Sequence, residues 1–421
     1  MSTPLPWGDT QSPWTFGQVK HQGSVTLGKM LQTKDTGQDV LAPYMRAANV
    51  QPDGVLSLDD VKGMWFSPGE LRDLSLRQGD VVVVEGGQGG FGRAAYVGED
   101  LDGWGFQNSI NRVRSSADND GRFLAYYLIA LRATGFIRRY CNIVSMPHLT
   151  AEKLAAIPIP LPSGPEQRAI ADYLDRETAE IVSLIAAQER FIGLLQERRQ
   201  AVISHAFQEL PNPRTPLRRY IRFLTSGSRG WGDYYADEGD IFVRIGNLPR
   251  QSLHLGGEIQ HVGLPPHVRE GQRTRLREND LLFSITAHIG SIAVVGTEWV
   301  DAYVSQHVAL CRLELSQLDP RFVGYFMLGT EGQDQLLQRA VGGTKVQLAL
   351  DDIRGLRIPA PALQEQRRIA AYLDRETANI DTLIAKTRRH IELAEERRSA
   401  LVAAAVTGQI DITKGPEQWW T

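Results

Sequence analysis

A block of 42 residues occurs twice in this chain, 199 residues apart. Residues 166–207 and 365–406 are identical at 24 positions, including the unbroken run YLDRETA. A duplication of this length indicates two copies of one unit in a single polypeptide. Such a chain can have an approximate two-fold axis and present two similar faces to its partners.

The duplication extends upstream of the block, where the sequences have diverged. At the same offset the segment 157–160 matches 356–359, the Arg-Phe…Tyr pattern at 122–126 matches 321–325, and Gln107 matches Gln306. Further upstream the offset changes by one residue, so that Gly79-Asp80 matches Asn279-Asp280. The chain therefore reads as variable domain, helix, variable domain, helix.

Both repeated blocks are predicted to be long α-helices. Neither contains an internal Pro, and both are rich in Ala, Glu, Arg and Leu, which favour helix. Apolar residues recur every seven positions, as in Leu174, Ile181 and Leu195, which indicates a coiled-coil seam with polar interruptions. Forty-two residues give roughly 60 Å of helix. Helices this long, charged on their other faces, fit poorly inside one domain each.

The variable domains are predicted to be mixed α/β. Short apolar or alternating runs bounded by turns indicate strands, and two apolar runs indicate short helices. The predicted strands are Asp80–Val84, Ile241–Ile245, Leu281–Ile285, Ile292–Val295 and Val308–Leu315, and the predicted helices are Phe123–Arg132 and Pro320–Leu328.

Composition indicates an ordinary soluble protein of two to four domains. Among 421 residues the net charge is −3, and the two cysteines lie in no metal-type pair, so we expect neither a disulfide framework nor a zinc site. No signal peptide or membrane span is evident, and we expect a cytoplasmic protein. Arg outnumbers Lys 38 to 8. Arg is suited to guanine edges and phosphates, although a GC-rich genome explains the excess equally well.

Motifs for catalysis are weak. The segment 23–29 resembles a phosphate-binding loop, but Met30 stands where Ser or Thr should hold magnesium. The glycine-rich segment 86–92 opens no long helix, so a surface loop is the simpler interpretation. No amino-methyltransferase segment or metal-ligand spacing is present. We therefore expect no catalytic residues, no metal and no cofactor bound by this chain.

Polar and aromatic loop residues are the natural tools for reading base edges in DNA. Taken singly, each is more often a solvated surface residue. The candidates for DNA contact are Gln88, Arg93, Asn108, Arg112, Arg114, Ser228, Arg229, Trp231, Tyr234, Lys345 and Gln347.

The ordered elements resemble a known family. A diverged domain ends in Ile-Pro-x-Pro and is followed by Glu-Gln-Arg-x-Ile-Ala-x-Tyr-Leu-Asp and a long helix, all given twice. This resembles the specificity subunit of type I restriction–modification systems over nearly all of residues 40–410. The second half, including residues 343–369, is the clearer match; the first domain departs more, which implies a different half-site.

The resemblance implies an α+β chain of two tandem target-recognition domains whose long helices form an antiparallel coiled coil with pseudo-two-fold symmetry. The expected segments are a first recognition domain, first helix, second recognition domain, second helix and tail, at residues 1–162, 163–210, 211–361, 362–407 and 408–421. Each domain would read one half of a split double-stranded DNA target, and the helices would set the spacer.

Chemistry would then reside in partners. The resemblance implies two methylation subunits that bind S-adenosylmethionine, and restriction subunits that use ATP and Mg²⁺. If both helices serve identical methylation subunits, the same outward residues are needed twice. For the Glu-Gln start, helix capping is an equally good explanation. The candidates for partner contact are Glu166, Gln167, Tyr173, Arg198, Arg199, Glu365, Gln366, Tyr372, Arg397 and Arg398.

Two other classes stay open. A non-enzymatic scaffold with two protein-binding domains on a helical spacer would show no DNA preference and have no methylation partner. A self-contained methyltransferase or nuclease would require a cofactor motif that the sequence does not display.

Overall fold

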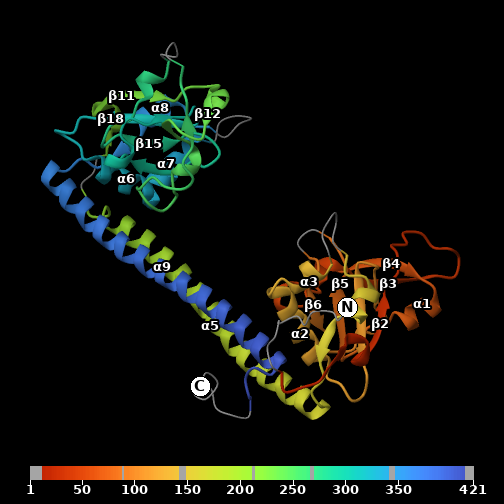
Figure 1. The fold of residues 1–421 in the computed structure, drawn as a ribbon. Helices are drawn as coiled ribbons and strands as arrows, with labels where there is room; N and C mark the ends of the chain where they lie inside the picture. Colours follow the sequence, from red (N-terminus) through yellow and green to blue (C-terminus); the bar gives the residue numbers. More distant parts are fainter. Residues whose placement is uncertain are drawn as a thin grey trace. The chain divides into compact units, whose positions relative to one another are not determined.

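A computed structural model describes residues 12–87, 90–141, 148–210, 214–265, 270–340 and 347–412. The chain divides into two compact units (Figure 1). The first unit comprises residues 1–187 and 390–421, and the second unit comprises residues 188–389. Both boundaries fall inside the long helices, so each helix contributes to both units. The five segments expected from the sequence stay a prediction.

The first unit is built on a four-stranded antiparallel sheet in the order β2-β8-β5-β6. Its third strand, the Asp-Val-Val-Val-Val run, is buried along its whole length, as a β-branched run in the middle of a sheet should be. The four strands are β2 (Gly23–Leu27), β8 (Ile110–Ser115), β5 (Asp80–Val84) and β6 (Ala94–Tyr96).

Smaller strand groups flank this sheet. A three-stranded sheet has the order β4-β3-β7, with β3 (Val40–Met45), β4 (Lys62–Phe66) and β7 (Gly105–Phe106). The pair β1 (Phe16–Gln18) and β9 (Pro158–Pro160) is antiparallel. Three short helices complete the domain: α1 (Pro68–Asp73), α3 (Phe136–Tyr140) and α4 (Ala151–Ala155).

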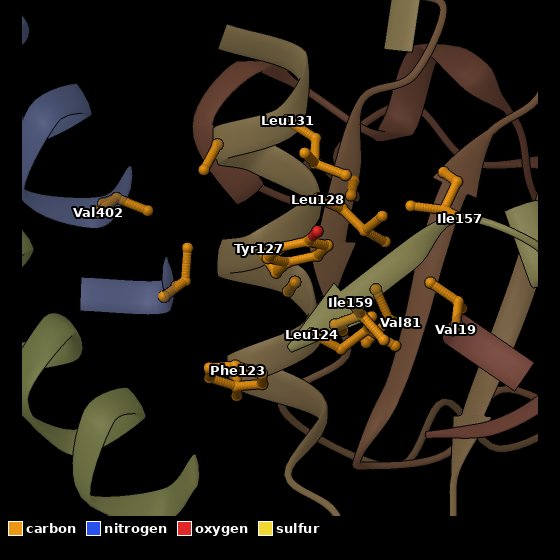
Figure 2. Close-up of a cluster of buried hydrophobic side chains, with 14 of the residues drawn as sticks. Val19, Val81, Phe123, Leu124, Tyr127, Leu128, Leu131, Ile157, Ile159 and Val402 are labelled. Atoms are coloured by element: carbon orange, nitrogen blue, oxygen red, sulfur yellow. The ribbon is translucent and has the colours of Figure 1, made fainter. Parts of the chain in front are cut away.

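Helix α2 (Gly121–Ala133) connects the first domain's sheet to the long helices. The Asp120 carboxylate accepts a hydrogen bond from the Arg122 amide at 2.8 Å and caps the helix start. Its apolar face is buried in one cluster with residues of β5, β9 and the second long helix, as Figure 2 shows. The labelled residues of this cluster include Phe123, Leu124, Tyr127, Leu128, Leu131, Val81, Ile157, Ile159 and Val402.

The second unit repeats this plan. Its main sheet has the order β11-β18-β15-β16 and its smaller sheet the order β12-β14-β13-β17. The strands are β10 (Thr215–Pro216), β11 (Ile221–Ser226), β12 (Tyr235–Ala236), β13 (Asp240–Val243), β14 (His261–Val262), β15 (Leu281–Ser284), β16 (Ile292–Val294), β17 (Tyr303–Val304), β18 (Val308–Leu313) and β19 (Arg357–Ile358). The helices are α6 (Pro320–Leu328), α7 (Thr330–Ala340) and α8 (Leu350–Gly355).

The two long helices are α5 (Gly164–His205) and α9 (Leu363–Thr407). In the first unit, Leu174 near the start of α5 shares a core with Leu401 near the end of α9. In the second unit, Leu195 near the end of α5 packs with Ile380 and Ile384 from the first half of α9. The helices therefore run antiparallel, which agrees with the seam predicted from the sequence. Among the described residues, no helix has the length and apolar composition to cross a membrane.

Candidate nucleic-acid interface and helix surface

An aspartate–arginine pair braces the main sheet of each domain. The Arg114 guanidinium donates two hydrogen bonds to Asp80, both at 2.8 Å, and Arg312 donates to Asp280 at 2.9 Å. Both aspartates are buried, and burial raises the pKa of Asp280 although Arg312 opposes the shift. The guanidinium of Arg114 is held by this carboxylate, but its side chain is 29% exposed, so the contact of Arg114 with DNA stays a prediction.

Arg112 is also a structural residue. Its side chain is buried, it donates to the carbonyls of Asp73 at 3.0 Å and Ser75 at 2.7 Å, and its guanidinium lies over the Phe106 ring. Burial lowers the pKa of Arg112. To contact DNA, Arg112 would have to break its hydrogen bonds with these carbonyls and leave them unpaired inside the domain. The predicted base contact of Arg112 is therefore wrong.

Two predicted residues of the second domain are likewise internal. The Trp231 ring is 3% exposed and lies between Phe242 and Tyr303, with ring centroids 5.5 and 5.3 Å away. Ser228 is buried and forms an isolated β-bridge with Ser305. Trp231 and Ser228 are therefore packing residues of the second domain, and the predictions that they contact DNA are corrected.

The other described candidates reach solvent. Arg229 and Gln347 are exposed, while Arg93, Asn108 and Tyr234 are half-buried. The guanidinium of Arg93 donates to the carbonyl of Val50 at 3.3 Å. Their contact with DNA stays a prediction. Gln88 and Lys345 lie outside the described residues.

The glutamines that open the two long helices have equivalent internal bonds. Gln167 accepts from the Asp120 amide at 3.0 Å, and Gln366 accepts from the Asp319 amide at 2.9 Å. Each also donates to a proline carbonyl in the turn before its helix, at 3.0 and 2.8 Å. Both side chains are 1% exposed. These bonds tie the start of each long helix to the turn before it and to the start of the neighbouring short helix, so Gln167 and Gln366 have a packing role and their amides are not offered to a partner.

The adjacent glutamates are also engaged locally. The Glu166 carboxylate accepts from the Ser163 amide at 2.8 Å and from its hydroxyl at 2.6 Å, which lowers the pKa of Glu166. Glu365 pairs with Arg368 at 2.7 Å, which lowers the pKa of Glu365. Glu166 is exposed and Glu365 half-buried, so both can still meet a partner.

Arg199 and Arg398 face inward. Arg199 is 5% exposed, pairs with Asp381 and donates to Gln251 at 3.3 Å. Arg398 pairs with Asp53. Arg199 thus joins the end of α5 to α9 and, through Gln251, to the second recognition domain, whereas Arg398 joins the end of α9 to the first recognition domain. Since the guanidinium groups are used inside the units, the prediction that they contact a partner is corrected.

The remaining partner candidates lie on the outside, with one exception. Arg198 and Arg397 are exposed, and Tyr372 is 41% exposed. Tyr173 is only 7% exposed, although it occupies the position equivalent to Tyr372. An arginine guanidinium lies over each tyrosine ring, at 5.5 Å in the first copy and 5.8 Å in the second. Burial therefore makes Tyr173 a core residue, which corrects that prediction.

Sequence reasoning missed the contacts that seat each short helix on its long helix. Tyr126 and Arg122 of α2 both donate to Asp175 at 2.8 Å. The same pattern was visible in the sequence, because arginine, tyrosine and aspartate all recur 199 residues later. Arg122 and Tyr126 belong to the upstream match and Asp175 to the repeated helix, and their spacing in the sequence does not show that they meet.

A second missed feature is a set of exposed leucines on the long helices. Leu184 and Leu194 are 51% and 61% exposed, and their equivalents Leu383 and Leu393 are both 45% exposed. Identity of both copies at an exposed apolar position could have indicated this surface. Each unit carries one leucine from α5 and one from α9.

The comparisons with known proteins are consistent with this plan. The family described as "Type I restriction modification DNA specificity domain" matches residues 13–189 and 268–393. The EcoBI specificity subunit of Escherichia coli, a type I restriction enzyme subunit, is 24% identical over 314 residues, or 68% of this chain. The match spans 64% of the length of that subunit.

Two solved structures share the fold. A chain from a study of complex assembly and conformational transition of the type I R-M system has a TM-score of 0.69 at 19% identity, covering 95% of this chain and 99% of the other. The HsdS subunit from Thermoanaerobacter tengcongensis has a TM-score of 0.54 at 18% identity, covering 96% and 100%. Since the family match covers more than half of the residues, in both halves of the duplication, the chain belongs to the type I restriction–modification DNA specificity family.

Proposed function

We propose that this chain is the DNA-reading subunit of a type I restriction–modification complex and recognises a bipartite double-stranded target. The supporting observation is a common frame with different loops. Both domains have the same braced sheet and the same short helix seated on a long helix, yet the exposed candidates differ between them. One frame with two sets of loop residues suits two different half-sites.

The two antiparallel helices would fix the separation of the half-sites, because a continuous helix is stiff along its length. On this proposal the chain has no catalytic residues of its own. Methylation subunits carrying S-adenosylmethionine would modify adenines, and restriction subunits would use ATP and Mg²⁺, all in the cytoplasm.

The helix surface supports docking of two identical methylation subunits. Each unit presents one exposed leucine from each helix, together with an exposed arginine, Arg397 in the first unit and Arg198 in the second. Apolar side chains at the centre with arginine beside them are typical of protein interfaces. Because the same residues occur in both units, two copies of one partner could bind equivalently.

A selection experiment tests the DNA-reading role. The full chain, alone and with its methylation subunit, is incubated with random duplexes, and the bound duplexes are sequenced. We expect two short motifs at a constant separation. In the matched pair of variants, Arg229→Ala should relax only one motif and Arg93→Ala only the other. If the bound duplexes share no motif, the result would favour the scaffold interpretation, in which the domains bind protein.

A further inference from the structure

A polar pocket of about 660 Å³ lies in the first unit, beside the Asp80–Arg114 pair. It is formed by the turn before β5, the end of β8, the start of α2 and the first turn of α5. Four arginines, Arg77, Arg114, Arg122 and Arg168, line it with only two carboxylates, Asp80 and Asp120. The lining therefore carries two more positive than negative charges.

The excess charge rests on two of the arginines. Arg114 is paired with Asp80, and Arg122 is paired with Asp120 at 2.8 Å. Arg77 and Arg168 have exposed side chains and come from different elements, the turn before β5 and the long helix. Two guanidinium groups converging from separate elements on one pocket are suited to an anion.

Neutral donors complete the lining. The Ser115 hydroxyl is buried without a hydrogen-bond partner, although it lines the pocket. A buried polar atom left unpaired calls for a ligand or a water. Ser116 accepts from Asn119 at 2.7 Å, which leaves its own hydroxyl proton to donate. Burial raises the pKa of Tyr96, so its hydroxyl is also a donor at neutral pH.

The second copy provides an internal comparison. All four arginines have an equivalent arginine in the second copy, namely Arg277, Arg312, Arg321 and Arg367. The equivalent positions carry four carboxylates instead of two. Glu278 and Glu314 stand where the first copy has Gln78 and Ser116. The equivalent residues of the second copy therefore carry no excess charge among themselves, although one of the added carboxylates, Glu314, is paired with Arg222 outside this set. The excess in the first copy does not follow from the fold alone.

The neutral lining changes in the same direction. In the second copy Leu313 stands in place of Ser115, and Val294 in place of Tyr96. Leu313 is buried, and Leu318, which stands where Asn119 does, is fully buried. The polar donors of the pocket thus belong to the first copy only.

We propose that this pocket is a phosphate-binding site of the first domain. The phosphate could belong to a free anion, such as a nucleotide, or to a DNA backbone. The volume is in the range of small-ligand sites. This site stands apart from base reading and does not require the proposed function to be correct.

The test compares matched double variants of the full chain. Arg77→Gln/Arg168→Gln removes the excess charge, and Arg277→Gln/Arg367→Gln removes the equivalent pair in the second copy. A third variant, Ser116→Glu, introduces the carboxylate found in the second copy. All the altered side chains are exposed, so folding should persist, as thermal unfolding would verify.

Calorimetry with inorganic pyrophosphate is the first measurement. We expect binding to weaken about tenfold or more in Arg77→Gln/Arg168→Gln and in Ser116→Glu, since one charge-assisted hydrogen bond is worth that factor. The second-copy variant should bind like the unaltered chain.

The salt dependence of duplex binding distinguishes the two sources of phosphate. A DNA phosphate predicts that the slope of log affinity against log salt falls by about 2 in Arg77→Gln/Arg168→Gln only. An unchanged slope with lost pyrophosphate binding assigns the site to a free anion. Equal effects of the two double variants, or no effect in either assay, overturn the proposal. The pyrophosphate result stands even if the chain selects no DNA sequence.

Discussion

The hydroxyl of Tyr126 donates to the carboxylate of Asp175 at 2.8 Å and so joins the first recognition domain to its own long helix. The equivalent bond, from Tyr325 to Asp374, is also 2.8 Å long. In both copies an arginine four residues before the tyrosine binds the same carboxylate. The domain–helix seat is therefore duplicated along with the helix, whereas the loops have diverged.

The seat should be stronger in the second copy. Tyr325 is 2% exposed and Tyr126 is half-buried, so Tyr325→Phe leaves Oδ1 of Asp374 without its donor where water cannot easily replace the hydroxyl, while the arginine still binds Oδ2. We expect Tyr325→Phe to lower the free energy of local opening of α6 by about 1.5–3 kcal/mol, and Tyr126→Phe to lower that of α2 by less. Hydrogen–deuterium exchange of peptides from α2 and α6 measures both. Exposed Tyr235→Phe is the control, and equal losses in all three would contradict the argument.

The buried glutamine at the start of α9 should be needed for stability. Gln366→Ala removes three hydrogen bonds, to the Asp319 amide and to the carbonyls of Gln317 and Pro361. We expect a cost of about 2–4 kcal/mol, because buried backbone groups are left unpaired. The neighbouring exposed Gln364→Ala should change stability by less than about 0.5 kcal/mol. Thermal unfolding of the two variants decides: similar melting temperatures would mean that the hydrogen bonds of Gln366 do not stabilise the start of α9.

Adjacent arginines on α5 should have separable effects. Arg199→Ala removes the ion-pair partner of Asp381 and leaves a cavity beside it. We expect the free energy of unfolding of the second unit to fall by about 1–3 kcal/mol, less than for a fully buried pair because Asp381 is half exposed. Arg198→Glu with Arg397→Glu should leave stability nearly unchanged and weaken capture of the methylation subunit. Thermal unfolding and co-purification measure the two effects. Unchanged capture by the Arg198/Arg397 variant would remove both residues from the proposed interface.

Stability should fall at high pH through Tyr173. Burial raises the pKa of Tyr173 to about 12 from an ordinary value of 10.0. The folded state therefore favours the neutral phenol, and the stability this residue contributes is complete below pH 10 and is lost as the pH rises toward 12. Tyr173→Phe cannot ionise and should lose less stability over this range. Urea unfolding at several pH values measures the free energy of unfolding of both chains. If this free energy falls with pH in parallel for the two chains, folding does not raise the pKa of Tyr173.

Much of the fold follows from the sequence because periodicity and duplication can be read directly from the order of the residues. The helix predicted at Pro320–Leu328 and the strand predicted at Asp80–Val84 have these bounds in the structure. The strand predicted at Ile241–Ile245 is instead Asp240–Val243, because Ile245–Asn247 forms a 3₁₀ turn capped by Asn247. A capping side chain ends the strand where apolar character alone would continue it.

The site was less predictable, because residue type does not reveal burial. Arg112 and Arg114 have the chemistry to read guanine, yet carbonyls distant in sequence hold Arg112 inside the domain, and a carboxylate distant in sequence pairs with Arg114. Trp231 likewise is enclosed by Phe242 and Tyr303, from two other strands. The upstream match of Gln107 with Gln306 was also one residue out. The Gln107 amide donates to Met45 as that of Ser305 does to Val243, so Gln107 corresponds to Ser305.

The most direct test of the central claim is to map modified bases. The chain is expressed with its methylation subunit in a host that lacks adenine methylation, and the genome is sequenced for methyladenine. The account predicts modification at one bipartite motif, with two specified halves separated by a constant gap. Complex formation without methylation would contradict the DNA-reading role, and neither complex nor methylation would favour a protein-binding scaffold.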